Sequence, residues 1–232
     1  HALFSDKYAI CDLPEDFSCS RVETIVYDPD FLIIGEYDRP GKRIACITQQ
    51  SCTINAFYNE DRTVRHIHAI YRAPNSNDLI VATGDTAKYL DEWTIQNQKV
   101  AFNKRLKPAL AGHTAIISVG GHFYLGSDFS NRPNYIERMD GKKFFFPEQA
   151  YKMYVLKFKK YQDRYIISLS KELPCFGARY SISVFDTQKE EFVYCDYQDR
   201  TSAQMFNLAD SQIEIQLRSM SAGELAYDMV QV

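Results

Sequence analysis

The chain has 232 residues, of which 45% are hydrophobic and 14% aromatic, enough to bury a core within a single domain covering residues 1–232. A formal net charge of -3 gives no basic excess for binding phosphates, so nucleic acid is excluded as an expected partner. No apolar stretch approaches the ~20 residues that a membrane-spanning helix needs, so membrane insertion is not expected.

A strand-turn-strand pattern recurs five times along the chain. The copies begin at Val22, Ile67, His113, Tyr154 and Gln204. Their period of about 40–50 residues is typical of propeller blades or solenoid units. Alternating apolar residues and turn-forming pairs such as Gly120-Gly121 predict strands throughout, with little helix.

Each of the first four repeats contains four strand candidates. In chain order they are 22–27, 31–37, 43–48 and 53–58; 67–72, 78–83, 89–95 and 99–103; 113–119, 122–127, 134–138 and 143–146; and 153–159, 164–169, 179–185 and 191–196. The fifth repeat has only three, at 203–208, 212–217 and 224–230. We expect the segment Lys7–Cys11 to supply its fourth strand, because joining the two chain ends in one sheet removes open edges.

The repeat therefore predicts an all-β fold, a five-bladed β-propeller with four-stranded blades whose last blade is closed by the N-terminal strand. An open β-sandwich or a pair of small barrels is the alternative.

The six cysteines form no Cys-x-x-Cys pair, and in a chain of this size we expect free, mostly buried thiols. In an oxidising compartment the favoured pairs are Cys46 with Cys52, or Cys11 with Cys19. The absence of a signal-peptide pattern at the start and of disulfide-type spacing slightly favours a cytoplasmic location, which the sequence leaves otherwise unknown.

Two passages resemble bacterial sialidase-like (BNR-type) propeller proteins. They are Arg65–Asp85, with its His-x-His opening and Thr-Gly-Asp end, and the stretch from Gly112 through His122–Asp128 to Asn134–Ile136. The resemblance covers about residues 64–140 and implies a propeller fold and an association with glycans. The Asp boxes are degenerate, since Ser183–Asp186 lacks the following Gly and Trp, and no arginine triad can be assigned. The resemblance thus implies glycan recognition rather than true sialidase activity.

In a propeller the first strand of each blade lines the central channel. Aligning the repeats puts one polar residue of each copy at equivalent first-strand positions: Glu23, His68, His113, Tyr154 and Gln204. Side chains alternate along a strand, so Arg21 and His66, two residues earlier, face the same way. The loops after the second strands add Asp38, Asp85 and Asp128. These residues predict a polar pocket at the channel mouth.

Three functions fit such a pocket. The leading hypothesis is recognition of an oligosaccharide or polysaccharide by Arg21, His66, His68, His113, Asp38, Tyr154 and Gln204. The first alternative is a glycoside hydrolase or lyase that uses Glu23 with Asp85 or Asp128, since glycosidic hydrolysis needs two carboxyl groups. The second is a scaffold whose rim binds proteins. No cofactor is expected, although His66, His68 and His113 are a candidate set for a divalent metal.

Overall fold

The computed structural model describes most of the chain. The described ranges are 13–19, 21–37, 42–49, 51–59, 63–74, 76–108, 112–129, 132–150, 152–172, 180–198, 214–219 and 226–231. The predicted closing strand Lys7–Cys11, the predicted strand 203–208 and the candidate site residues Asp38 and Gln204 lie outside them.

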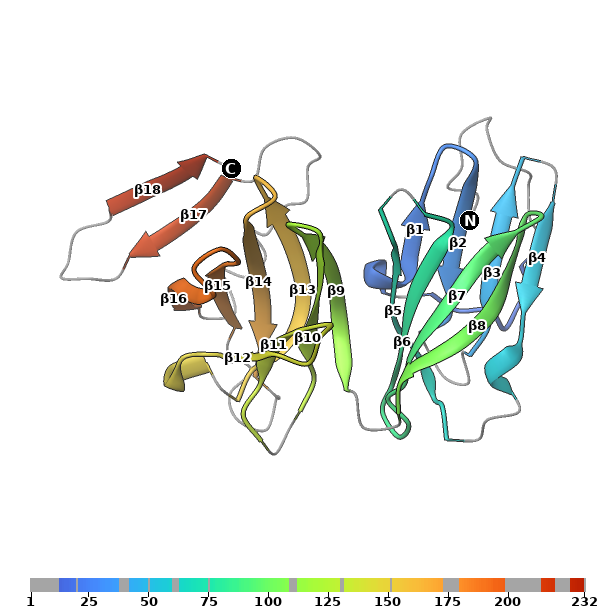
Figure 1. Ribbon diagram of the computed structural model, residues 1–232, viewed down its shortest axis with the longest axis horizontal. Helices are drawn as coiled ribbons and strands as arrows, with labels where there is room; N and C mark the ends of the chain where they lie inside the picture. Colours follow the sequence, from blue (N-terminus) through green and yellow to red (C-terminus); the bar gives the residue numbers. More distant parts are fainter. Residues whose placement is uncertain are drawn as a thin grey trace.

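Four antiparallel sheets follow one another along the chain, each with its strands in sequence order (Figure 1). The first consists of β1 (Ile25–Tyr27), β2 (Phe31–Gly35), β3 (Ile44–Thr48) and β4 (Cys52–Asn55), and the second of β5 (His66–Arg72), β6 (Asp78–Gly84), β7 (Leu90–Gln96) and β8 (Lys99–Lys107). The third contains β9 (His113–Val119), β10 (His122–Ser127), β11 (Tyr135–Arg138) and β12 (Lys143–Phe145), and the fourth β13 (Tyr154–Tyr161), β14 (Tyr165–Lys171), β15 (Tyr180–Asp186) and β16 (Glu191–Gln198). A hairpin of β17 (Glu214–Ser219) and β18 (Ala226–Gln231) comes last.

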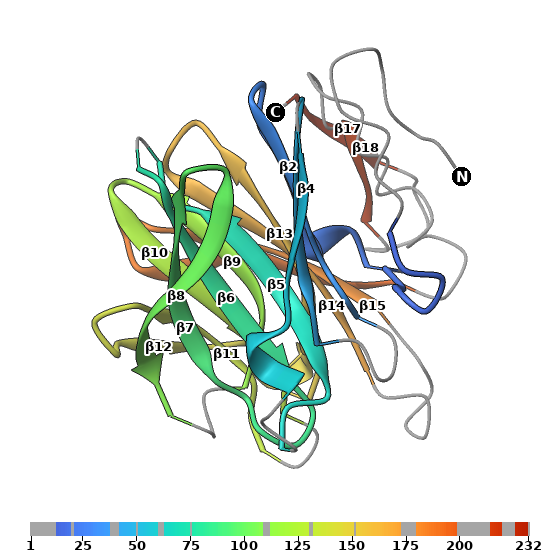
Figure 2. The ribbon, with the colours of Figure 1, turned by 90° about the vertical axis from the view of Figure 1, so that its right-hand side faces the viewer.

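The sheets pack as blades, because the first strand of each lies beside the first strand of the next. β1 contacts β5, β5 contacts β9, and β9 contacts β13, and the view in Figure 2 shows β5, β9 and β13 gathered at the centre. This arrangement confirms the all-β propeller with four-stranded blades. Five blades remain a prediction, since the described residues contain four four-stranded sheets and one two-stranded sheet.

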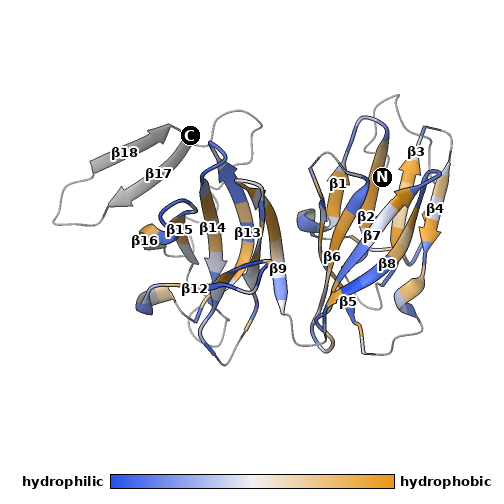
Figure 3. Cartoon of the chain, viewed as in Figure 1, coloured by the Kyte–Doolittle hydropathy of each residue, from blue (hydrophilic) through white to orange (hydrophobic). Residues whose placement is uncertain are grey.

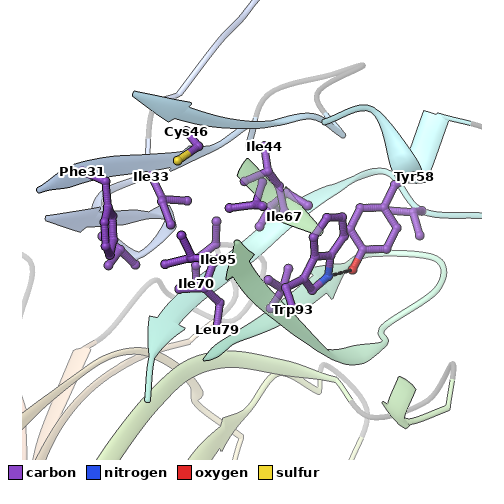
Figure 4. Packing of buried hydrophobic residues seen from close by; sticks show 14 of the residues in the cluster. Phe31, Ile33, Ile44, Cys46, Tyr58, Ile67, Ile70, Leu79, Trp93 and Ile95 are labelled. Atoms are coloured by element: carbon purple, nitrogen blue, oxygen red, sulfur yellow. Dashed lines mark hydrogen bonds between the residues drawn. The ribbon is translucent and has the colours of Figure 1, made fainter. Parts of the chain in front are cut away.

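The core lies between the blades rather than inside one of them. Strands β2, β3 and β9 are buried along their whole length, because each blade is covered on both faces. The sequences of β2 and β3 are accordingly almost continuous apolar runs (Figure 3), whereas β9 also buries His113, Thr114 and Ser118. Between the first two blades, Trp93 packs in a cluster with Ile67 and Tyr58, and its Nε1 donates a hydrogen bond to the Tyr58 hydroxyl at 3.1 Å (Figure 4). Each such buried apolar side chain contributes about 1.5–3 kcal/mol.

Two expected strands are partly wrong at their ends. Residues Val22–Thr24 form the 3₁₀ turn η1 instead of the start of β1, and Phe57–Asn59 form η2 after β4 ends at Asn55. The short third turn, η3, spans Glu148–Ala150. Within the described residues, the structure contains no helix with the length and apolar character to cross a membrane.

The cysteine expectation needs correction. Cys52 is disulfide-bonded, whereas Cys46 and Cys19 are free thiols. Free Cys46 rules out the Cys46–Cys52 pair, and free Cys19 rules out the pair with Cys11. The spacing of cysteines along the sequence does not reveal which ones fold together, and this is why the pairing could not be deduced.

Candidate functional site

A β-bulge interrupts the first strand of three successive blades. In β5 the pairing with β6 skips His68, in β9 the pairing with β10 skips Thr114, and in β13 the pairing with β14 skips Leu156. A bulge leaves one residue unpaired and re-aims its side chain and peptide group. Three bulges at the same level therefore form a hub of irregular backbone at the end where the first strands begin.

Arg21 crosses this hub from the segment that precedes η1. Its Nη2 donates hydrogen bonds to the carbonyl oxygens of Thr114 (3.0 Å) and Leu156 (3.1 Å), which belong to the bulges of the third and fourth blades. Its Nε lies 3.3 Å from a carboxylate oxygen of Glu23, and the guanidinium lies 5.3 Å from the ring centre of Tyr37. With 11% of its side chain exposed, Arg21 links three blades.

Three aromatic rings stack beside Arg21. The Tyr37 and His66 rings have centroids 4.5 Å apart, and the His66 and His68 rings 4.8 Å apart. His68 is buried, and its Nδ1 lies 3.3 Å from the carbonyl oxygen of His113. A carbonyl only accepts, so Nδ1 carries the proton. Burial, together with the charge of Arg21, lowers the pKa of His68 well below its usual value, so this imidazole is neutral.

Gly84 provides the space for the His68 ring. A Cβ atom on Gly84 would lie 1.9 Å from Nε2 of His68, far inside any contact distance. Gly84 pairs with His66 across the β5–β6 ladder, so a side chain here would fill the place that the bulged residue occupies. The Thr-Gly-Asp end of β6 is therefore matched to the His-x-His start of β5.

Each of the three candidate carboxylates has a cationic neighbour. Glu23 lies between Arg21 and Lys157, whose Nζ is 3.8 Å away. Asp85 follows β6 with a left-handed φ of 67° and lies 3.4 Å from Nη1 of Arg65. Its other oxygen is 3.7 Å from Nε2 of His66.

Asp128 follows β10 and receives two contacts from one lysine. Lys88 Nζ donates to its carbonyl oxygen at 2.8 Å and to its carboxylate at 3.1 Å. The same carboxylate lies 3.8 Å from Nδ1 of His68. Tyr154, at the start of β13, lies near Asp128, and burial together with the Asp128 charge raises the pKa of its phenol group. Burial lowers the pKa of Lys157 at the same end of the hub.

His113 belongs to a different cluster. Its Nε2 lies 3.0 Å from a carboxylate oxygen of Glu137 on β11, which also forms an ion pair with Lys107 at the end of β8. Burial would raise the pKa of Glu137, but the hydrogen bonds from His113 and Lys107 outweigh it and lower the pKa to about 2. The His113 ring thus joins the second and third blades instead of facing His66 and His68.

The bulges correct the sequence alignment of the repeats. His68 is equivalent to Thr114 and Leu156, so His113 corresponds to Ile67 and not to His68. Glu23 lies in η1, before the first strand begins. A one-residue bulge has no sequence signature, and it shifts every later side chain to the opposite face.

The structure brings together Arg21, Glu23, His66, His68, Asp85, Asp128 and Tyr154 of the sequence-predicted set. Arg65, Lys88 and Lys157 were not expected at this site. Arg65 directly precedes the His-x-His pair and Lys88 follows the Gly84-Asp85 turn, so a basic residue next to each motif was the available signal.

No protein-family model and no curated protein matches the chain. Among solved structures, it is similar to extracellular domains 1–2 of Drosophila Semaphorin 1b and to Drosophila Plexin A in complex with Semaphorin 1b. In both cases the identity is 11% and the TM-score 0.46, and the alignment covers 75% of this chain. The chain spans 40% of the length of those proteins, and a similarity this distant indicates neither a partner nor an activity. The resemblance to sialidase-like propellers stays a prediction.

Proposed function

We propose that the protein is a non-catalytic, ligand-recognising propeller that binds an oligosaccharide at the mouth of the hub. One observation supports this most directly: two ion pairs, Asp85–Arg65 and Asp128–Lys88, flank the buried ring stack and remain partly open to solvent. Asp85 and Arg65 expose 38% and 34% of their side chains. Carboxylates that accept and cations that donate are the groups that sugar hydroxyls and acidic sugars engage.

The surroundings of the carboxyl groups favour binding over hydrolysis. A glycosidase needs one carboxyl group as an acid, typically held in an apolar environment, and a second as base or nucleophile. Glu23 has Arg21 and Lys157 as neighbours, and Asp128 has Lys88. Neither carboxyl group has the apolar surroundings that suit a general acid.

A glycan array followed by titration with the strongest acidic or neutral oligosaccharide tests the proposal. The buffer contains EDTA, so that the result does not depend on metal. We expect Asp85→Asn and Arg65→Gln to weaken binding at least about tenfold, the effect of losing about 1.4 kcal/mol from one charged hydrogen bond. The matched control is Arg138→Gln, which removes an ion pair between the third and fourth blades.

Two outcomes would overturn the proposal. An array without enrichment, or equal binding by the Asp85→Asn variant and the parent, excludes oligosaccharide recognition at this mouth. Turnover of a glycoside that disappears in a folded Glu23→Gln variant would establish the hydrolase alternative instead.

A protein-binding scaffold is the second candidate, favoured by two apolar side chains on β1. Ile25 and Tyr27 are 41% and 65% exposed while Val26 between them is buried. A photo-crosslinker in place of Tyr27 should capture one discrete protein, and the same group in place of Lys142 should not. Equal labelling from both positions contradicts this candidate.

A further inference from the structure

We propose that His66, His68 and Asp85 form a binding site for a divalent first-row transition metal ion such as Zn²⁺. The inference goes beyond oligosaccharide recognition and does not depend on it. One ligand atom from each residue lies within 4.8 Å of the others. Two imidazole nitrogens and one carboxylate oxygen, with the remaining positions open, are a donor set that such metals use in proteins.

The orientation of His68 suits a ligand. Its Nδ1 faces the carbonyl oxygen of His113 at 3.3 Å, so the proton is on Nδ1 and Nε2 presents its lone pair. Metal-binding histidines are usually fixed in this way, with the second ring nitrogen donating to a carbonyl or carboxylate. Nε2 points over Gly84, the residue directly before Asp85. The third ligand is thus one residue away along the chain.

The placement of Asp85 depends on an unusual backbone conformation. Its φ of 67° is in the left-handed region, which non-glycine residues seldom adopt. This turn brings Oδ1 to 3.7 Å from Nε2 of His66.

The distances require only a small contraction. Ligands bound at about 2.0–2.2 Å in a tetrahedral site lie about 3.3–3.5 Å from one another. The present spread of up to 4.8 Å must therefore close by about an ångström or slightly more. Both histidines are buried, but Asp85 is 38% exposed and can rotate toward them. The ion would also enter from this exposed side.

The positive charge of Arg65 disfavours the binding of a metal cation, and this effect provides a distinctive test. Nη1 of Arg65 lies 3.4 Å from Oδ2 of Asp85 and competes for its charge. Removing this guanidinium should increase the metal affinity, while removing a ligand should decrease it. Metal bound adventitiously at another site would show neither effect.

The experiment measures Zn²⁺ binding by calorimetry and Co²⁺ binding by visible absorption, using full-length protein treated with EDTA, dialysed and free of glycan. We expect one Zn²⁺ per chain, with affinity at least about tenfold weaker in Asp85→Asn and His66→Gln and stronger in Arg65→Gln. The control His122→Gln changes an exposed histidine at the start of β10 and should bind like the parent.

Absence of saturable binding, or unchanged affinity in the Asp85→Asn variant, would overturn the metal site. Urea unfolding shows whether the buried His66→Gln variant folds. If it does not, the affinity of the Asp85→Asn variant alone tests the metal site. Because glycan titrations are done in EDTA and Zn²⁺ titrations without glycan, failure of one proposal does not affect the other.

Discussion

Replacing Gly84 with alanine tests the packing of the hub most directly. The new Cβ would lie 1.9 Å from Nε2 of His68, whereas non-bonded atoms prefer about 3.5–4.0 Å, so the ring must move by at least about 1.5 Å. The ring has little room to move, because His68 is buried between the His66 ring and the His113 carbonyl. We expect the free energy of unfolding to fall by about 1–3 kcal/mol, the usual cost of overpacking a core.

A double-mutant cycle with His68→Ala identifies the cause. The three atoms nearest to the new Cβ all belong to the His68 imidazole, so His68→Ala removes the closest contacts of the alanine. Gly84 has no left-handed φ, so alanine there should be neutral, or stabilising by ~0.5–1 kcal/mol. Urea unfolding of the parent, both single variants and the double variant gives the coupling energy. Equal destabilisation by Gly84→Ala in both backgrounds would refute the proposed fit between this glycine and this ring.

Three further predictions concern stability and thiol chemistry. Arg21→Ala should lower the free energy of unfolding by about 2–4 kcal/mol, measured with urea, because two buried carbonyl groups lose a charged donor. Arg21→Gln should recover part of this loss. An unchanged urea midpoint in Arg21→Ala would contradict the prediction. Burial lowers the pKa of both His68 and His113, so the stability that the two neutral rings contribute is present at pH 7 and is lost as the pH falls below about 6.5. The free energy of unfolding, measured from pH 8 to pH 5, should show this loss, and the loss should be smaller in His68→Gln. Peptide mapping without reductant should find Cys52 in a disulfide-linked peptide and buried Cys46 alkylated only after denaturation; alkylation of Cys52 in the native, unreduced protein would contradict this.

Local sequence signals located the strands well. The predicted ranges 113–119 and 122–127 coincide with β9 and β10, because the pair Gly120-Gly121 between them adopts the positive φ values, 57° and 77°, that a tight hairpin turn requires. Alternation and turn chemistry act over a few residues, so they can be recognised without the rest of the molecule.

The site was predicted only in part, because the bulges and ion pairs depend on contacts between blades. His68 and His113 look equivalent in the sequence, yet a bulge directs one to the hub and leaves the other facing Glu137. Likewise, the alternation rule placed Arg21 beside the channel, but the rule could not show that its partners would be carbonyl groups of Thr114 and Leu156. These contacts join residues 93 and 135 positions apart.

The three bulges also explain why we expect different roles for the basic residues of the hub, stabilisation of the fold for one and ligand binding for others. A buried carbonyl group without a partner costs about 1–3 kcal/mol. Arg21 satisfies two such groups through Nη2 and also forms an ion pair with Glu23, so its guanidinium mainly stabilises the fold. If the proposed recognition of an oligosaccharide holds, we expect the ligand to contact the cations whose partners are at the rim, Arg65 and Lys88. Arg65→Gln should consequently alter ligand binding with little effect on stability, whereas Arg21→Ala should lower stability first.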